Sequence, residues 1–457
     1  MTATREEVSS KRRMGGDTWI RPKRLLIVAA IFHVAVTMAI YTVGRYAVLP
    51  SNFDSNGIAV SFAPDAAIDR ADAATLSEIL RRSSFRDWLT APFAFHTKLY
   101  SLCFALFGTT LGMNILGAEP INLLFYLAML ILVFQLGQEA FNARAGILAS
   151  VIVGLWPSLV LHSTQMLKDP LFLVGMLGFV LINVRLLSRN LSWLPATWLA
   201  LLGGLVAIFV WLGRDSMGQM LVSTSLLGVT LLVVRQVREK QLRTANLFAL
   251  TLLALISISV TLLLPRFTKP DNPTATTNMV IADELSSNTA TENSTAQSTQ
   301  TKQGPVARVS ALRKRFIEMY PDSTSNLDTH IQLTRMADIL RYTPRAAAIG
   351  FFAPFPNMWL ASGKQVGSAG RLLSGIETLG MYAIEALAII GLWRERRRVS
   401  VWLLVGTATI GVIALGLIVV NIGALYRLRY AFLILIIIVA AGGISDLLGR
   451  YNSRAHS

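Results

Sequence analysis

Long apolar segments constrain this chain more than any other feature of its sequence. Segments of about twenty predominantly apolar residues recur along the 457 residues, of which 53% are hydrophobic and only 15% are charged. A segment of that length crosses the hydrocarbon core of a bilayer as one helix. Soluble domains rarely combine so much apolar surface with so little charge. The sequence therefore predicts an all-α polytopic membrane protein.

About ten transmembrane helices are expected, with further helices at the membrane surface and one long external loop. The expected spans are 25–46, 122–141, 145–161, 171–187, 193–212, 217–234, 247–264, 372–393, 401–421 and 430–443 with its flanks.

Clusters of lysine and arginine orient these spans. They precede the first span and follow the spans that end at 234 and 393. Cytoplasmic loops carry the excess of basic residues, so both termini are expected in the cytoplasm. The expected organisation is a basic N-terminus (1–24), a first transmembrane block (25–264) with an external acidic loop (48–96), an external segment (265–371), a second transmembrane block (372–448) and a cytoplasmic tail (449–457).

Segment 99–115 decides the orientation of everything after it. It is apolar but short, and Gly108 and Gly112 interrupt it. If it crossed the membrane, the large basic clusters would face outside, against the positive-inside rule. We therefore expect it to be re-entrant or interfacial, packed against protein that satisfies its backbone.

The external segment 265–371 has two characters. Its first part, 268–303, is rich in Ser, Thr, Asn and Gln and is expected to be disordered. The part from 306 to 359 regains apolar periodicity and predicts amphipathic or interfacial helices.

Composition also limits the partners. The net charge of +16 would suggest nucleic acid in a soluble protein, but here the basic residues lie in short clusters between apolar spans. They indicate topology and contact with membrane lipids, and no nucleic-acid partner is expected. Cys103 is the single cysteine, which excludes a disulfide within the chain.

The first external loop carries the candidate catalytic acids Asp54, Asp65 and Asp69, with Asp72 close behind. Asp65 and Asp69 are four residues apart and would share one face of a helix. A carboxylate there can act as general base toward an acceptor hydroxyl, or hold a divalent cation beside a pyrophosphate-like leaving group. The alternative is a solvated helix N-terminus, where aspartate is favoured for capping and dipole reasons.

Three further candidates for substrate binding are Lys168, Asp169 and Arg214. Under the expected topology they face the same side as the acidic loop. Asp169 before Pro170 is also an ordinary helix start, and Arg214 beside Asp215 could be a local ion pair. His162 lies one turn away, but no other His or Cys stands at ligand spacing to it, so no metal site is expected from histidine.

Arg427 and Arg429 complete the candidate binding residues. They lie between Asn421 and the last apolar span, on the side where positive charge is normally depleted. The guanidinium fork matches phosphate oxygens. Snorkelling at a helix end is the alternative.

The order of these features resembles the GT-C superfamily of polytopic glycosyltransferases, especially bacterial relatives of family 39 and the protein mannosyltransferases. The resemblance covers about half of the chain and is carried by "APDAAIDRADAATLSEIL", "KLYSLCFALFG", "NLLFYLAMLILVFQLGQEAFNARAGILASVIVGLWPSLVLHSTQMLKDPLF" and "NIGALYRLRYAFLILIII". Two features depart from the family: Ile68 and Asp69 stand where an aromatic residue usually follows the loop aspartate, and the loop lacks a tight pair of acids.

The resemblance implies a polyprenyl-phosphate sugar donor, an active site on the external face of a bacterial inner membrane, and a catalytic aspartate in the first loop. Asp65 matches that aspartate, with Asp69 and Asp54 as fallbacks. Asp169 matches the second acidic position, and Arg427 or Arg429 the contact to the donor phosphate.

The sequence thus predicts an enzyme that transfers a sugar from a lipid-linked donor to a glycan, lipid or protein acceptor. One alternative is a polymerase or ligase of envelope polysaccharide, which would extend chains instead of adding single sugars. Another is a non-enzymatic flippase or scaffold. Transport would favour charged residues inside the spans, and few were evident there.

Overall fold

The computed structural model describes residues 22–48, 63, 65–268, 304–319, 321, 323–360 and 367–455. Within these ranges the regular secondary structure is helical, and the only strand-like pairing is an isolated bridge between Asn326 and Asn421. Asp54, residues 1–21 and all but the first residue of 268–303 lie outside the described part.

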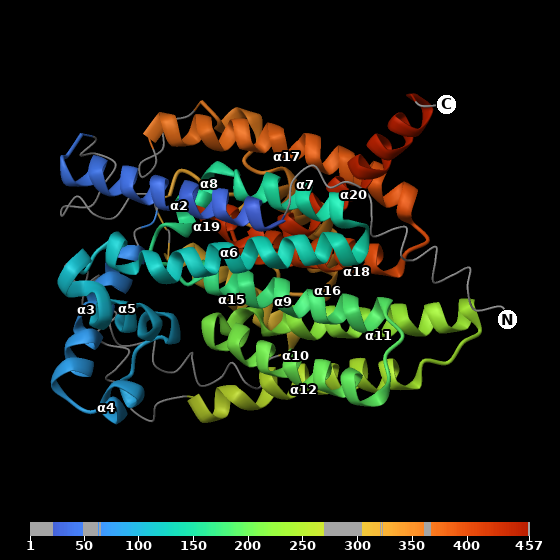
Figure 1. Cartoon of the computed structure of the whole chain (residues 1–457), viewed down its shortest axis with the longest axis horizontal. Coiled ribbons are helices and arrows are strands. Elements are labelled where there is room, and N and C mark those ends of the chain that lie inside the picture. Colours follow the sequence, from blue (N-terminus) through green and yellow to red (C-terminus); the bar gives the residue numbers. More distant parts are fainter. Residues whose placement is uncertain are drawn as a thin grey trace.

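Nine helices of the described chain are long and apolar enough to cross a membrane. They are α2 (Pro22–Arg45), α6 (Ile115–Ala140), α9 (Asp169–Ser188), α10 (Trp193–Gly213), α11 (Gly218–Glu239), α12 (Thr244–Thr268), α17 (Gly367–Glu395), α18 (Val399–Ile418) and α20 (Tyr430–Ala455). Figure 1 shows them as one bundle of roughly parallel and antiparallel helices. The predicted fold class, an all-α polytopic membrane protein, is confirmed.

The expected span 145–161 is not one straight helix. It is a pair, α7 (Ala143–Gly154) and α8 (Pro157–Ser163), bent by 70° at the break. Pro157 has no N–H to donate and its ring pushes the preceding residue out of the helical region, so the helix ends before it and a new one starts. Counted as one broken span, this pair brings the total to as many as ten.

Other boundaries also move from the sequence prediction. Helix α2 begins at Pro22, so the last residues of the expected N-terminal segment 1–24 are helical. Helix α6 begins at Ile115, seven residues before the expected start of its span. Helix α20 runs to Ala455, through most of the expected tail 449–457.

Three helices lie together at one end of the bundle, which we call the α3 end. They are α3 (Asp65–Arg82), α4 (Phe85–Thr90) and α5 (Phe95–Leu111). Helix α5 overlaps the segment expected to be re-entrant or interfacial and is not among the nine candidate spans. Figure 1 shows α3, α4 and α5 beside the ends of the long helices. We call the opposite end, where α11 ends and α12 begins, the basic end.

Helix α20 forms the centre of the bundle, because 78% of its span-length window is buried inside the protein. Its backbone comes very close to that of α17: a Cβ on Gly443 would lie 2.7 Å from the Cα of Gly391. Helices in membranes pack through such small residues, which let the backbones approach. This packing fixes where the residues just before Tyr430 must lie.

Two helices occupy the region where amphipathic helices were expected, α15 (Pro305–Met319) and α16 (Met336–Phe352). Helix α16 packs tightly on α18, since a Cβ on Gly416 would lie 2.1 Å from the carbonyl oxygen of Ala346. Arg313 of α15 is buried and donates to the carbonyl of Leu417 at 2.9 Å. Both helices therefore pack against the bundle through α18.

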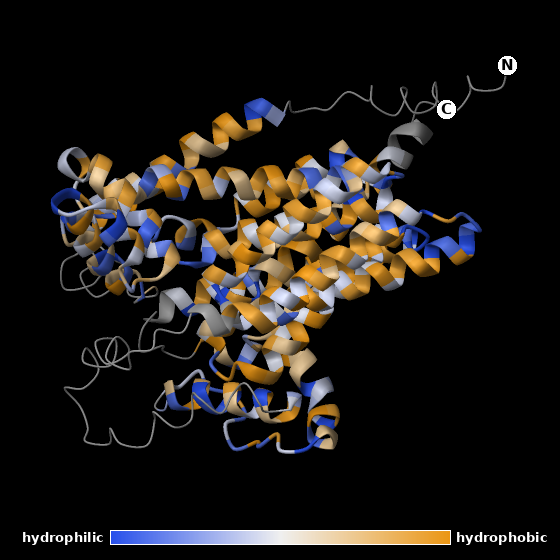
Figure 2. Cartoon of the chain, turned by 90° about the horizontal axis from the view of Figure 1, so that it is seen from below, coloured by the Kyte–Doolittle hydropathy of each residue, from blue (hydrophilic) through white to orange (hydrophobic). Residues whose placement is uncertain are grey.

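Polar and apolar residues separate along the bundle axis. Figure 2 shows apolar residues through the middle of the bundle and polar residues gathered at the α3 end and at the basic end. Many apolar side chains on the long helices are exposed, such as Ile31, Trp198, Leu255 and Ile389. An apolar waist of this kind is that of an integral membrane protein.

Candidate functional site

The first element of the site is an ion pair between residues far apart in sequence. Arg427 Nη2 donates to Asp65 Oδ2 at 3.1 Å, across a separation of 362 residues. Asp65 is the first residue of α3, and Arg427 lies in the short helix α19 (Ile422–Leu428). The Asp65 side chain is 46% exposed and that of Arg427 only 16%. The Asp65 carboxylate is therefore open to solvent, while the Arg427 guanidinium is largely buried.

A second acid–arginine pair joins Asp169 and Arg214. Asp169 is in the first turn of α9, and Arg214 is the C-cap residue of α10. Both side chains are only 11% exposed, and the Arg214 guanidinium lies over the ring of Phe172, 5.4 Å from its centroid. Asp169 also lies within electrostatic range of Arg427. The two pairs therefore act in one electrostatic environment.

A narrow cavity lies beside Asp169, with room for about one water molecule (about 10 Å³). Its walls carry polar groups from Asp169, His162, Ser163, Tyr126 and Tyr430, and the other lining residues are apolar. Lys168 is exposed next to it at the N-cap of α9.

Glu377 of α17 is the centre of a buried hydrogen-bond network next to this cavity. Its two carboxylate oxygens accept from the backbone N–H of Ser158 at 2.6 Å and from the Ser158 hydroxyl at 2.5 Å. The hydroxyl of Tyr426 also donates to Glu377, and Tyr430 donates to Ser158 Oγ at 2.6 Å. Because Tyr426 directly precedes Arg427, Glu377 holds the helix that carries the arginine.

Burial is the largest cause that raises the pKa of Tyr426, and the neighbouring Glu377 carboxylate adds to it. The phenol therefore stays protonated and keeps donating to Glu377 at physiological pH.

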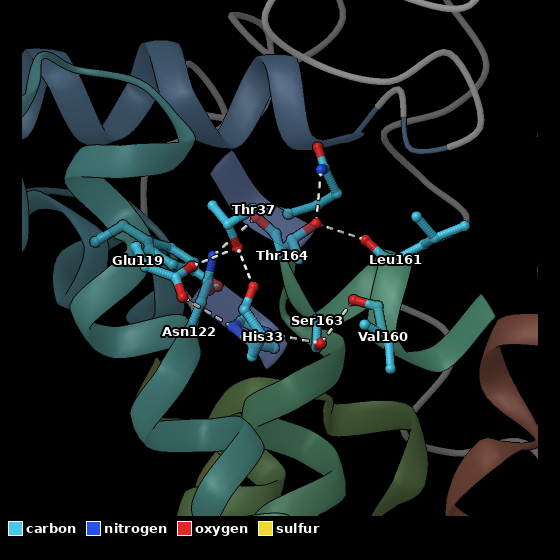
Figure 3. Close-up of polar contacts among 10 residues, drawn as sticks. His33, Thr37, Glu119, Asn122, Val160, Leu161, Ser163 and Thr164 are labelled. Atoms are coloured by element: carbon cyan, nitrogen blue, oxygen red, sulfur yellow. Dashed lines mark hydrogen bonds and ion pairs between the residues drawn. The ribbon is translucent and has the colours of Figure 1, made fainter. Parts of the chain in front are cut away.

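A second buried hydrogen-bond network joins α2, α6 and α8 (Figure 3). It consists of His33 and Thr37 of α2, Glu119 of α6 and Ser163 of α8. His33 Nδ1 lies 2.8 Å from Glu119 Oε1, and Nε2 lies 3.0 Å from Ser163 Oγ. Thr37 Oγ1 donates to Glu119 Oε2 at 2.8 Å.

The Ser163 hydroxyl has an acceptor of its own, which sets its role toward His33. Ser163 Oγ donates to the carbonyl of Val160 at 2.8 Å, so it accepts from His33 Nε2–H. Since Ser163 also lines the cavity, the network reaches its wall.

The turn that presents Asp169 is fixed by two further side chains. Tyr100 of α5 donates from its hydroxyl to the carbonyl of Leu167 at 3.1 Å. Asn122 Nδ2 donates to the carbonyl of Thr164 at 3.0 Å, and Figure 3 shows both of these residues. The segment between α8 and α9 is therefore bound to both α5 and α6.

Asp69 has a different partner from Asp65. It lies 3.0 Å from His96 Nε2, between α3 and α5. Asp72 lies one turn further along α3, and its pKa is raised by partial burial and by the charge of Asp69, while His96 lowers it. Asp65 and Asp69 thus belong to neighbouring but separate contacts.

Arg429 is fully buried and binds the backbone. Its Nη1 donates to the carbonyls of Gly350 and Phe351 at 3.1 and 3.3 Å, at the end of α16. Its guanidinium also lies over the ring of Tyr426, 4.9 Å from the centroid. These contacts fix α16 against the start of α20, and substrate binding by Arg429 stays a prediction.

Among the described residues, no three His, Cys, Asp or Glu side chains gather in a way that could hold a metal ion. A divalent cation held by the carboxylates of the first loop, beside a pyrophosphate-like leaving group, stays a prediction.

The structure thus brings Asp65, Asp169, Arg214 and Arg427 to one end of the bundle. Sequence reasoning missed the buried acids Glu119 and Glu377. Each lies inside a helix that could cross the membrane, where an ionisable residue is costly and is by default a functional candidate. The spans therefore hold more ionisable residues than the sequence predicted.

No protein-family model matches this chain, and no curated protein matches it.

Proposed function

We propose that this protein is a membrane glycosyltransferase that moves a sugar from a polyprenyl-phosphate donor to a glycan, lipid or protein acceptor. The observation that carries the proposal is the contact between Asp65 and Arg427, next to the pair Asp169–Arg214. An acid and an arginine from opposite halves of the chain provide a base and a phosphate ligand side by side.

In the proposed reaction Asp65 is the general base. It removes the proton from the acceptor hydroxyl as that oxygen attacks the anomeric carbon of the donor sugar. The bond between the anomeric carbon and the phosphate oxygen breaks, and its electron pair leaves with the polyprenyl phosphate. Direct displacement of this kind inverts the anomeric configuration.

Arg427 binds the leaving phosphate. In the structure its Nη2 donates to Asp65 Oδ2 at 3.1 Å. The donor is a phosphodiester with one negative charge, and its two free oxygens fit the guanidinium fork, so it would compete with Asp65 for Arg427 and release the carboxylate. The polyprenyl phosphate that leaves gains a second negative charge, which strengthens its contact with Arg427. The half-exposed carboxylate is then available to the acceptor, which couples base activation to donor binding.

The other groups position the donor and hold the site. Lys168 is exposed beside Asp169, and its ammonium group can bind the donor phosphate at the surface of the site. Arg214 is committed to Asp169, and Glu377 fixes α19 through Tyr426.

The proposal includes an orientation and a location. The α3 end would face the periplasm of a bacterial inner membrane, and the basic end the cytoplasm, because cytoplasmic loops carry the excess of Lys and Arg.

The test is transfer from a panel of radiolabelled polyprenyl-phosphate monosaccharides in vesicles that contain the full chain and a crude envelope acceptor fraction. Asp65→Asn should lower transfer about 100-fold or more, because the base is lost. Arg427→Ala should raise the KM for donor, with partial recovery in Arg427→Lys. Glu78→Gln, on the same helix and in a surface pair with Arg82, is the matched control and should stay active.

Full activity of Asp65→Asn would refute the assignment of the base. Chain extension of the product, instead of addition of one sugar, would indicate a polymerase.

A second candidate is a transporter of lipid-linked glycans, and the buried pair His33–Glu119 favours it. Buried ionisable pairs inside membrane helices mark proton relays in transporters. A flippase would move a fluorescent lipid-linked sugar across the vesicle, would lose this on Glu119→Gln, and would keep it on Asp65→Asn. The transferase predicts the reverse dependence on Asp65.

A further inference from the structure

A second cavity lies at the basic end, across the bundle from Asp65. Its volume is about 400 Å³, and it opens where α6 and α11 end and α18 begins. Its charged walls are four arginines and two glutamates, namely Arg235, Arg238, Arg397, Arg398, Glu139 and Glu239.

Both glutamates already have arginine partners. Arg189 donates to the two oxygens of Glu139 at 2.8 and 2.6 Å. Glu239 accepts from Arg235 at 2.8 Å and from Arg243 at 3.0 Å. The negative charges of the wall are therefore neutralised by the protein.

Two of the wall arginines are also committed. Arg235 Nη1 donates to the carbonyl of Leu187 at 2.6 Å, at the end of α9. Arg398 Nη1 donates to the carbonyl of Ala140 at 3.0 Å, at the end of α6, while its Nε contacts Glu395 at 2.8 Å. These contacts satisfy the carbonyls that a helix leaves unpaired at its C-terminus.

Arg238 and Arg397 are different. Both are exposed, both line the cavity, and neither makes a hydrogen bond or an ion pair with any residue the structure describes. Arg238 lies in the last turn of α11, and Arg397 lies in the turn before α18. Two guanidinium groups thus line one cavity whose two glutamates are paired with other arginines.

We propose that this cavity binds a phosphate group, that of an anionic lipid headgroup. Paired guanidinium groups suit phosphate oxygens, and basic pockets between helix ends at a membrane surface bind anionic headgroups. Figure 2 shows this polar end directly adjoining the apolar middle of the bundle, so acyl chains could lie along the helices while the headgroup enters the cavity. The site is separate from the proposed transferase site.

The test uses the purified full chain in a neutral detergent. Native mass spectrometry counts retained lipid, and the thermal unfolding midpoint is followed during titration with cardiolipin, phosphatidylcholine or inorganic phosphate. The variant Arg238→Gln/Arg397→Gln removes the two uncommitted arginines. The control Lys240→Gln/Arg396→Gln removes the same charge from positions close in sequence that do not line the cavity; Arg396 lies over Trp393 instead.

We expect cardiolipin to bind and to raise the midpoint of the wild type and the control. In Arg238→Gln/Arg397→Gln the apparent affinity for cardiolipin should fall on the order of tenfold or more, since each arginine near an anionic headgroup contributes about fivefold. The midpoint without lipid should not change, because both side chains are exposed.

Equal loss in the control would overturn the proposal, because it would show an effect of net charge alone. Equal stabilisation by phosphatidylcholine would also overturn it. Stabilisation by inorganic phosphate at low millimolar concentration, with none from cardiolipin, would replace the lipid by a soluble phosphate ligand.

Discussion

At the α3 end Asp65 bonds an arginine 362 residues away, whereas at the basic end Glu239 bonds Arg235 and Arg243, each four residues from it along the chain. The first contact exists only if two halves of the protein pack correctly. The second contact needs only helix α11 and the four residues that follow it. The difference separates charge pairs that stabilise one helix end from charge pairs that join distant parts of the chain.

Burial separates the pair Asp169–Arg214 both from Asp65, whose side chain is 46% exposed, and from Glu239 at the basic end. The side chains of Asp169 and Arg214 are each 11% exposed, while that of Glu239 is 39% exposed. Buried ion pairs are costly to break because the remaining charge cannot return to water. Local surface pairs contribute little. Loss of one charged partner should therefore lower the free energy of unfolding much more at Asp169–Arg214 than at Glu239.

The largest effect is expected for Arg214→Ala, which leaves Asp169 buried without its partner. We expect a loss of about 3–5 kcal/mol in the free energy of unfolding. It can be measured by reversible unfolding in mixed micelles. The exposed Arg86→Ala on α4 is the control and should change little.

The double variant Asp169→Asn/Arg214→Gln sharpens this test. The double variant removes both charges. Its loss in the free energy of unfolding should therefore be smaller than the sum of the losses in the single variants Asp169→Asn and Arg214→Gln. Simple additivity would show that the two residues do not act as a pair.

A much smaller effect is expected for Glu239→Gln at the basic end. Its pair with Arg235 within α11 should contribute about 0.3–0.5 kcal/mol, and its pair with Arg243, which lies beyond the end of α11, no more than about 1 kcal/mol. Both contributions should shrink as salt is raised. The same unfolding measurement at low and high ionic strength checks it. A loss as large as that of Arg214→Ala would erase the distinction between the two ends.

The smallest effect is expected from Asp72, which is only partly buried. Because its pKa in the folded protein is raised, mainly by burial, the folded state holds this proton more tightly than the unfolded state. The contribution to stability is present at low pH and is lost as pH rises through the folded pKa.

Asp72→Asn should therefore flatten the dependence of the unfolding midpoint on pH in the acid range above the ordinary pKa of aspartate. Glu78→Gln on the same helix serves as the control. A wild-type midpoint that rose with pH through that range, with the rise removed by Asp72→Asn, would contradict the assigned direction.

The fold class and most spans could be predicted because transmembrane helices depend on local composition. The expected range 193–212 almost coincides with α10 (Trp193–Gly213), since an apolar segment of that length has few other stable forms in a bilayer. The 70° break between α7 and α8 could not be predicted in size: Pro157 signals a break, but neighbouring helices set its angle.

The candidate site was only partly accessible to sequence reasoning. The positive-inside rule placed Asp65, Asp169, Arg214 and Arg427 on one side of the membrane, but a side is not a distance. Glu377 was missed although an acid inside an apolar span is itself a signal. Nothing in the sequence could assign it to Ser158 and Tyr426.

The sequence by itself determined that this chain is a bundle of membrane helices, and it concentrated the acids near one end and the arginine clusters near the other. Both follow from hydropathy and charge read over short windows. Only the tertiary structure decided that Asp65 meets Arg427, that Asp69 meets His96, and that Arg429 binds the end of α16. Those partners depend on how each helix is rotated and how closely it packs against the next, and small residues far from the site, such as Gly391 and Gly443, set that packing.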